Sequence, residues 1–303
     1  MSKPVMTMMV GLVGSGKSHY ANKLAEETNA TVFSSDKLRE EMLGDINDQD
    51  HQSEVFQELH KRIKDCLKSG KNAIYDATNI SSKRRRSFLQ ELSKIDCEKR
   101  CVIMATPYEQ CLANNASRDR NVPEEVIDRM YRNWNTPYWF EGWNDIKIVY
   151  WENSENSDSV WHWLNEHMDY CQDNPHHTMT LGQHCWETIG SLADEDPLNG
   201  IMRAGLLHDC GKPHVKTFTN SKGETTDIAH YYGHENVSAY DILFYDCGVA
   251  NPLDVSILAN LHMKPYAWER DNNAKLQNKY RKLWGEDLYN SVIMLHEADK
   301  AAH

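Results

Sequence analysis

Two groups of residues in this chain have the types and spacing that phosphate chemistry requires. The first is residues 11–18, which read Gly-Leu-Val-Gly-Ser-Gly-Lys-Ser. The second group combines imidazole and carboxylate side chains in the other half of the chain: His184, His208, Asp209, His234, His262 and Asp299. A chain that holds both groups can add phosphoryl groups and also remove them. We therefore expect it to edit phosphates on a substrate with two reactive positions.

The glycine-rich segment matches the P-loop pattern Gly-x4-Gly-Lys-Ser. In such a loop, glycines let backbone N–H groups point at phosphate oxygens, the lysine reaches the β and γ phosphates, and the serine binds magnesium. We therefore expect ATP with Mg²⁺ to be bound by Gly14, Ser15, Gly16, Lys17 and Ser18. A glycine turn without a ligand is the alternative, which a predicted strand before the loop and a predicted helix after it disfavour.

Further candidates in the same half have the side chains that phosphoryl transfer needs. Asp36 follows a predicted strand, where it can orient an acceptor hydroxyl, and Arg39 shares its helix face. A helix N-cap explains Asp36 equally well. Asp76 ends another strand and offers a carboxylate near magnesium, or it belongs to an ordinary turn. Arg118 and Arg120 can supply positive charge near the transferred phosphoryl group.

The second group of residues has the composition of a metal site. A single histidine is most simply a buried, hydrogen-bonded one, but here all the candidates fall on helix-like segments or their ends. His208 and Asp209 are adjacent, so they cannot share a helix face, yet at a helix end both can reach one cavity. Asp209 can then bridge two cations, and such a pair activates water and neutralises a phosphoryl transition state.

The elements that must position these residues differ between the two halves. In residues 1–152, strands are expected at 5–10, 31–34, 72–76, 100–105 and 146–151, alternating with helices at 17–27, 54–68, 81–94, 108–117 and 124–134. This alternation predicts an α/β domain with a parallel sheet and helices on both faces. After a polar stretch at 152–158, helical spacing at 178–189, 201–208, 235–245, 252–262 and 287–300, without a convincing strand ladder, predicts an all-α domain over residues 160–303.

Length and composition agree with two domains and exclude several classes of protein. The chain has 303 residues, enough for two cores. No run of eighteen apolar residues occurs, and the apolar start leads into the glycine loop rather than a cleavage site, so we expect neither a membrane span nor secretion. Eight cysteines without Cys-x-x-Cys spacing suit reduced thiols in the cytoplasm.

The net charge of −12 is unevenly distributed along the chain. Residues 1–150 contain 22 Lys and Arg and 22 Asp and Glu, so the whole excess lies in the remainder. The run Lys83-Arg84-Arg85-Arg86 gives the first half a local basic surface suited to nucleic acid, with a solvated helix face as the alternative. Bound divalent cations would ease the repulsion in the acidic half.

Several segments of the first half resemble the P-loop polynucleotide 5′-hydroxyl kinase family over residues 1–150. They are the P-loop, Ser35-Asp36-x-x-Arg39, Asp76-Ala77-Thr78-Asn79, the basic run, and Arg118-x-Arg120-x-Val122-Pro123. The resemblance implies transfer of the ATP γ-phosphate to a 5′-OH end, with Asp36 as general base, Arg39 on the acceptor's phosphate, and Arg118 or Arg120 in a lid. These kinases usually carry a lid arginine about one helical turn before Arg118, where this chain has Asn114.

The second half resembles the HD phosphohydrolase superfamily over residues 160–303. The shared segments are Asn174-Pro175-His176-His177 before Gly182-Gln183-His184, Leu206-Leu207-His208-Asp209-Cys210-Gly211-Lys212-Pro213, Tyr232-Gly233-His234-Glu235, Leu261-His262-Met263, and Ala298-Asp299. The resemblance implies that the six candidate residues bind a metal pair, that Lys212 stabilises the phosphate, and that His177 faces substrate. A mononuclear site built from His184, His208, Asp209 and Asp299 is the alternative. Mn²⁺, Fe²⁺, Ni²⁺, Co²⁺ and Mg²⁺ all suit this ligand set.

Together the two resemblances imply an RNA end-healing enzyme. It would phosphorylate 5′-OH ends of RNA, or alternatively DNA, from ATP and remove a 2′,3′-cyclic, 2′ or 3′ phosphate with a metal. Both ends would then suit a ligase, which makes an RNA ligase the expected functional partner. The alternative is a small-molecule P-loop kinase fused to an HD nucleotidase or phosphodiesterase, because relatives that share these segments phosphorylate other hydroxyls.

Overall fold

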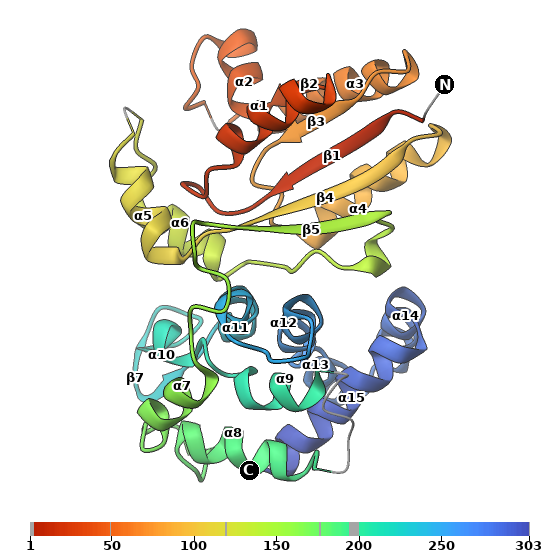
Figure 1. The fold of residues 1–303 in the computed structure, drawn as a ribbon. Helices are drawn as coiled ribbons and strands as arrows, with labels where there is room; N and C mark the ends of the chain where they lie inside the picture. Colours follow the sequence, from red (N-terminus) through yellow and green to blue (C-terminus); the bar gives the residue numbers. More distant parts are fainter. Residues whose placement is uncertain (1–2, 49, 119, 176, 194–199, 303) are drawn as a thin grey trace. The chain divides into compact units, whose positions relative to one another are not determined.

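The computed structural model describes residues 3–48, 50–118, 120–175, 177–193 and 200–302. The chain divides into two compact units, each drawn in Figure 1. The first unit consists of Met1–Ile127 and Pro137–Glu152, and the second consists of Asp128–Thr136 and Asn153–His303. Residues 128–136, which the sequence places within the first domain, therefore group with the second unit.

The first unit is built on a five-stranded parallel sheet with the order β2-β3-β1-β4-β5. Its strands are β1 (Val5–Val10), β2 (Thr31–Ser34), β3 (Ala73–Asp76), β4 (Glu98–Ala105) and β5 (Asp145–Tyr150). Met8 of the central strand lies opposite Tyr75 on one side and Cys101 on the other. The parallel sheet predicted from the alternation of strands and helices is confirmed.

Helices connect these strands and cover both faces of the sheet (Figure 1). They are α1 (Lys17–Thr28), α2 (Ser35–Leu43), α3 (Gln52–Lys68), α4 (Ser82–Glu91), α5 (Tyr108–Ala116) and the first turn of α6 (Glu124–Tyr131), whose residues from Asp128 onward group with the second unit. The expected helix at 81–94 is α4 followed by a 3-10 turn, Leu92–Lys94. Side chains alternate between the faces, so Met9 packs against Ala21 of α1, whereas Met8 faces a pocket lined by α3 and α4.

The second unit is helical, as predicted. Its helices are α7 (Val160–His167), α8 (Leu181–Gly190), α9 (Ile201–Leu207), α10 (Lys212–Val215), α11 (His234–Asp241), α12 (Pro252–Leu261), α13 (Lys264–Arg270), α14 (Ala274–Trp284) and α15 (Glu286–Ala301). Helix α12 is buried along nearly its whole length and packs against α9, α11 and α15. Because this apolar helix is central, its C-terminal end lies inside the unit.

The second unit is not entirely α-helical, although the sequence predicts an all-α domain. Strands β6 (Thr217–Thr219) and β7 (Thr225–His230) form an antiparallel hairpin. They are too short for a period of two to stand out, although their threonines and Ile228 favour extended backbone. In the described part of the chain, no helix combines the length and apolarity needed to cross a membrane.

Candidate active sites

The P-loop lies between β1 and α1 and is held from outside by the segment that follows β4. Thr106 Oγ1 donates to the Ser15 carbonyl at 3.1 Å, and Asn114 Nδ2 donates to the Gly14 carbonyl at 2.8 Å. Gly14 has φ +82°, and a Cβ there would lie 2.1 Å from the Cys111 carbonyl oxygen of α5. Only glycine fits this position. The Ser15 N–H donates to the Leu12 carbonyl at 3.2 Å, so the N–H groups at the start of α1 are the candidates to face a phosphate.

Two residues at the start of α1 have the positions that nucleotide binding requires. Ser18 Oγ donates to Asp76 Oδ2 at 2.8 Å, which places the hydroxyl and the carboxylate on one candidate magnesium site. The Lys17 ammonium is buried and donates to the Leu12 carbonyl. Burial lowers the pKa of Lys17 to about 8, and Asp76 only partly offsets this effect.

The acceptor-side residues predicted from the sequence are also brought together. Asp36 accepts from Arg39 Nη1 through Oδ1 at 2.8 Å and from Arg120 Nη1 through Oδ2 at 3.1 Å. Arg39 is 4% exposed, whereas the Asp36 side chain is 45% exposed and can meet a substrate. Asp36 lies one residue inside α2, whose N-cap is Ser34, so the N-cap alternative is wrong.

The two lid candidates occupy different surroundings. Arg120 is held by Asp36, by Asn47 Oδ1 at 2.8 Å and by the Ile46 carbonyl at 3.2 Å. Arg118 is exposed just beyond α5. Burial is the main cause of the lowered pKa of Lys17, and the positive charge of Arg118 lowers that pKa further. Asn114, where related kinases have an arginine, supports the P-loop backbone instead. Sequence reasoning noted this substitution but had no signal for its partner.

The basic run at residues 83–86 is not a continuous basic surface, and this expectation is corrected. Arg85 and Glu141 have fully buried side chains, and the guanidinium meets the carboxylate with two hydrogen bonds of 2.8 and 2.7 Å. Arg85 Nη1 also donates to the Asn79 carbonyl at 2.8 Å. Arg85 therefore fixes the loop after β3, while Lys83 and Arg84 remain exposed.

In the second unit, all six predicted metal ligands meet at one buried place. His184 lies on α8, Asp209 follows α9, and Asp299 lies on α15. His208 and His262 end α9 and α12, and His234 begins α11. Each is at most 6% exposed. The burial of so many ionisable groups in one place requires that they pair with one another or bind cations.

The distances between donor atoms fit a metal at one end of this cluster. With bonds of about 2.0–2.2 Å, neighbouring ligand atoms lie about 2.9–3.6 Å apart. His184 Nε2 lies 3.1 Å from His208 Nε2, 3.4 Å from Asp209 Oδ2 and 3.1 Å from Asp299 Oδ1. His208 Nε2 lies 3.4 and 3.6 Å from the same two oxygens. These four residues therefore fit one ion.

A second set of donors surrounds the other oxygen of Asp209. Its Oδ1 lies 3.1 Å from His234 Nε2 and 3.9 Å from His262 Nε2, and those two nitrogens are 3.3 Å apart. Asp209 thus presents one carboxylate oxygen to each set, as a bridging ligand would. This geometry favours two ions over the mononuclear alternative.

The backbone orients each imidazole of the cluster for metal binding. The Nδ1 atoms of His184, His208, His234 and His262 contact the carbonyls of Ala302, Gly205, Tyr231 and Ala259 at 3.2, 2.8, 2.8 and 2.6 Å. A carbonyl can only accept, so each Nδ1 carries a proton and each neutral ring turns its Nε2 lone pair to the cluster. Tyr266, which the sequence did not indicate, donates to Asp299 Oδ2 at 3.0 Å.

Without a metal, protons hold the cluster together. Burial, the largest effect, lowers the pKa of His208, but Asp209 and Asp299 outweigh it and raise the pKa to about 10. Burial lowers the pKa of His262 to about 3, assisted by His208 and His234. A divalent ion would replace the His208 proton between the two carboxylates.

Lys212 is a buried cation beside the candidate metal ligands. Its Nζ lies 2.7 Å from Asp209 Oδ2 and donates to Gln172 Oε1 at 2.8 Å. His177 Nε2 is 3.5 Å from the same ammonium, which places His177 at the cluster as the resemblance implies. A Cβ on Gly211 would lie 2.7 Å from the His234 carbonyl, so glycine allows this turn to reach α11. His176 lies outside the described residues.

Comparisons with known proteins agree with this two-part architecture. Residues 6–137 match the family model described as an AAA domain, and residues 176–302 match the model of the HD domain. L-seryl-tRNA(Sec) kinase of Methanococcus maripaludis is 24% identical over 151 residues, which cover 48% of this chain and 58% of that protein. The chain therefore spans little more than half the length of this curated relative.

Two solved structures resemble part of this chain. A chain of the Pnkp1/Rnl/Hen1 RNA repair complex is 22% identical, with 44% of each chain covered and a TM-score of 0.38. A gluconokinase from Sinorhizobium meliloti is 15% identical, with 50% of this chain and 84% of that chain covered and a TM-score of 0.36.

The fold, the sites and the family models together define the class of protein. The chain consists of a P-loop kinase-like domain followed by a helical HD domain. A P-loop kinase domain implies a nucleotide with magnesium, and an HD domain implies divalent metals.

Proposed function

We propose that this protein heals broken RNA ends. The kinase-like domain transfers the γ-phosphate of ATP to a 5′-OH end, and the HD domain removes a 2′,3′-cyclic, 2′ or 3′ phosphate. The observation that carries the proposal is the presence, in one chain, of an exposed carboxylate held by two arginines in the P-loop unit and a metal-ligand cluster with a buried lysine. Many ribonucleases leave RNA with the two kinds of end that these sites would repair.

In the kinase reaction, each residue has a distinct role. Backbone groups of residues 14–18 and the Lys17 ammonium bind the nucleotide phosphates, and Ser18 with Asp76 holds magnesium. Asp36 orients the acceptor hydroxyl and accepts its proton. Arg39 contacts the acceptor's phosphate, while Arg118 and Arg120 bring positive charge to the transferred group. The Asp36 contacts with Arg39 and Arg120 fix the carboxylate's orientation before the acceptor arrives.

In the hydrolytic reaction, the protein supplies buried metal ligands and a buried cation. His184, His208, Asp209 and Asp299 would hold one ion, and His234 and His262 would hold a second ion through the shared Asp209. Divalent metals supply an activated water and neutralise charge on the phosphoryl group. Lys212 would bind a phosphate oxygen, and His177 is placed to meet the substrate.

A second candidate function is a small-molecule kinase fused to an HD nucleotidase or phosphodiesterase. A pocket of about 430 Å³ in the first unit favours it, because this volume suits a single small molecule. Salt separates the two candidates, since a polynucleotide makes several phosphate contacts and its binding weakens steeply with salt.

The direct test uses an RNA oligonucleotide with a 5′-OH and a 2′,3′-cyclic phosphate. It is incubated with ATP, Mg²⁺ and Mn²⁺, and mass spectrometry resolves the states of the two ends. We expect the 5′ end to gain a phosphate, and Lys17→Ala to abolish this gain. At the other end we expect the cyclic phosphate to be opened or removed, and Asp209→Ala to abolish that reaction. ATP hydrolysis with neither end changed would refute end healing and favour the small-molecule candidate. Ends ready for joining would make an RNA ligase the functional partner.

A further inference from the structure

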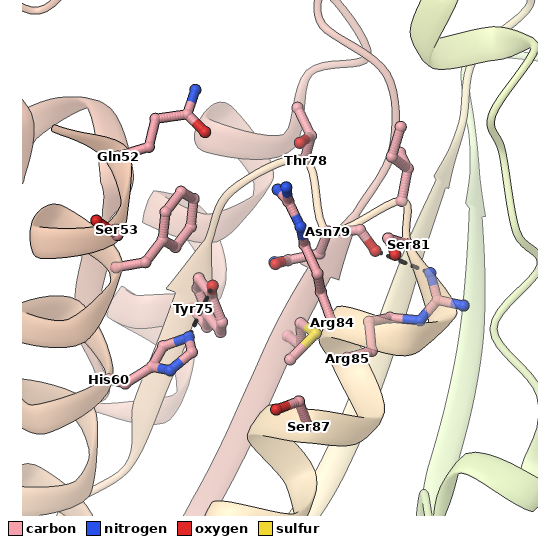
Figure 2. Close-up of a pocket in the computed structure, with 13 residues that line it drawn as sticks. Gln52, Ser53, His60, Tyr75, Thr78, Asn79, Ser81, Arg84, Arg85 and Ser87 are labelled. Carbon is pink, nitrogen blue, oxygen red and sulfur yellow. Dashed lines mark hydrogen bonds between the residues drawn. The ribbon is translucent and has the colours of Figure 1, made fainter. Parts of the chain in front are cut away.

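One pocket of the first unit takes no part in the RNA end-healing chemistry proposed above. It opens between α3, α4 and the loop that follows β3, with a volume of about 430 Å³ (Figure 2). Phe56, His60 and Tyr75 give it an aromatic wall, and Thr78, Asn79 and Arg84 form its polar end. A pocket that combines aromatic faces with a few polar groups suits a flat, partly polar ligand such as a nucleobase.

The pocket is joined to the phosphate-binding loop by short backbone connections. The Gly11 N–H donates to the Thr78 carbonyl at 3.1 Å, and Asn79 Nδ2 donates to the Met9 carbonyl at 2.9 Å. Asp76, the partner of Ser18, lies two residues before Thr78. An occupant of the pocket therefore has its polar end beside the place where phosphoryl transfer occurs.

Arg84 adds a cation at this polar end. Its side chain is exposed, and Figure 2 shows it extending from α4 toward Thr78. Among the described residues it has no carboxylate partner, in contrast to Arg85, which is bound to Glu141. Phe56 is only half-buried, and its ring centroid lies 6.4 Å from that of His60. A free cation beside an open aromatic face suits a ligand that carries both a base and a phosphate.

We propose that this pocket holds the nucleobase of the acceptor's 5′-terminal nucleotide, with Arg84 paired to the phosphodiester on its 3′ side. The inference rests on the proposed kinase function and deepens it, because it names the acceptor as a nucleotide with a free 5′-OH and a 3′ phosphate. The base packs against Phe56, and the 5′-OH is directed from the pocket toward the P-loop. The short connection from Asp76 to Asn79 sets how far the pocket lies from the P-loop.

The test compares acceptors that differ only in one base. A 5′-OH trinucleotide with a normal 5′-terminal base is compared with one that is abasic at that position and one that is abasic at the third position. Loss of a stacked base corresponds to a rise of about five- to 150-fold in the KM for the acceptor, with little change in the KM for ATP. We expect this rise for the 5′-abasic acceptor and not for the third-position one.

Variants of the pocket should reproduce the effect. Phe56→Ala should raise the acceptor KM on the normal trinucleotide and have no effect on the 5′-abasic one, and Phe56→Tyr should retain most of the affinity. Arg84→Ala should raise the acceptor KM on both. The matched control is Lys61→Ala, which removes an exposed cation from α3 outside the pocket. An unchanged dissociation constant for ATP shows that each variant is folded.

Binding without turnover separates this inference from the kinase function. The Asp36→Asn variant is titrated with 3′-labelled trinucleotides, and fluorescence anisotropy reports the affinity. If the normal trinucleotide binds more tightly than the 5′-abasic one but wild-type protein phosphorylates neither, the pocket inference stands and the kinase function fails. If wild-type protein phosphorylates both equally and Phe56→Ala has no effect, the kinase function stands and the pocket inference is overturned.

Discussion

The buried ion pair of Arg85 and Glu141 should dominate the stability of the first unit. Both side chains are 0% exposed, and Trp143 Nε1 also donates to Glu141 Oε2 at 3.0 Å. Arg85→Met would remove two charge-assisted hydrogen bonds and leave a buried carboxylate with one neutral donor. Breaking such a pair costs about 3–5 kcal/mol, because the remaining charge stays desolvated. Replacing both partners, as in Arg85→Met with Glu141→Leu, should recover most of that loss.

Urea unfolding measures this loss, followed in the transition that MgATP shifts to higher denaturant and that therefore belongs to the first unit. The matched control is Arg100→Met, since Arg100 and Glu98 also lie 2.7 Å apart but are 47% and 44% exposed. That surface pair should contribute at most about 1 kcal/mol. A cost below about 1 kcal/mol for Arg85→Met, or a double variant no more stable than the single, would show that the pair is hydrated.

Three further predictions concern protons and metals. Metal analysis should find two divalent ions per wild-type chain and one in His234→Ala, whereas one ion in wild-type protein would favour the mononuclear site. Because the pKa of Lys17 is about 8 in the free protein and bound phosphates raise it, MgATP binding near pH 8 should take up about half a proton per chain. Calorimetry in buffers of different ionisation enthalpy detects this uptake, which should be absent in Lys17→Met. Burial raises the pKa of Asp241, which accepts from Tyr131, to about 7, so the second unit should lose up to about 4 kcal/mol of stability as pH rises from 4 to 7. Asp241→Asn should flatten this dependence in thermal unfolding curves, and equal slopes for both proteins would contradict it.

The parts of this structure that the sequence predicts depend on local patterns. The P-loop motif lies within eight consecutive positions, and a short run of residues that favour strands predicts each strand of the sheet. The six candidate metal ligands lie far apart in the chain, but their types and the residues that flank each one can be recognised segment by segment. Each of these features can therefore be predicted from a single segment of the sequence.

The parts that could not be predicted depend on partners distant in the sequence. Arg85 looks like its neighbours in a basic run, and only Glu141, 56 residues later, makes it a buried structural cation. Asn114 supports Gly14 across 100 residues, and Tyr266 orients Asp299 across 33. No pattern in one segment marks these contacts, because burial and hydrogen bonding are set by packing between elements.

The charges of the HD cluster explain why its metals should control substrate binding as well as water activation. Two carboxylates, Asp209 and Asp299, and one ammonium, Lys212, leave a net negative charge when the four imidazoles are neutral. In the metal-free protein the proton on His208 cancels this charge, so the cluster offers a phosphate little attraction. One divalent ion in place of that proton makes the site positive, and a second, shared through Asp209, makes it strongly positive. Lys212 occupies the Asp209 oxygen that also faces His184 and His208, so it limits the negative charge at that end without replacing the metal. The affinity of the HD domain for a phosphate end should therefore rise with metal occupancy. Asp209 faces both sets of donors, so metal occupancy and phosphate affinity should both depend on this residue.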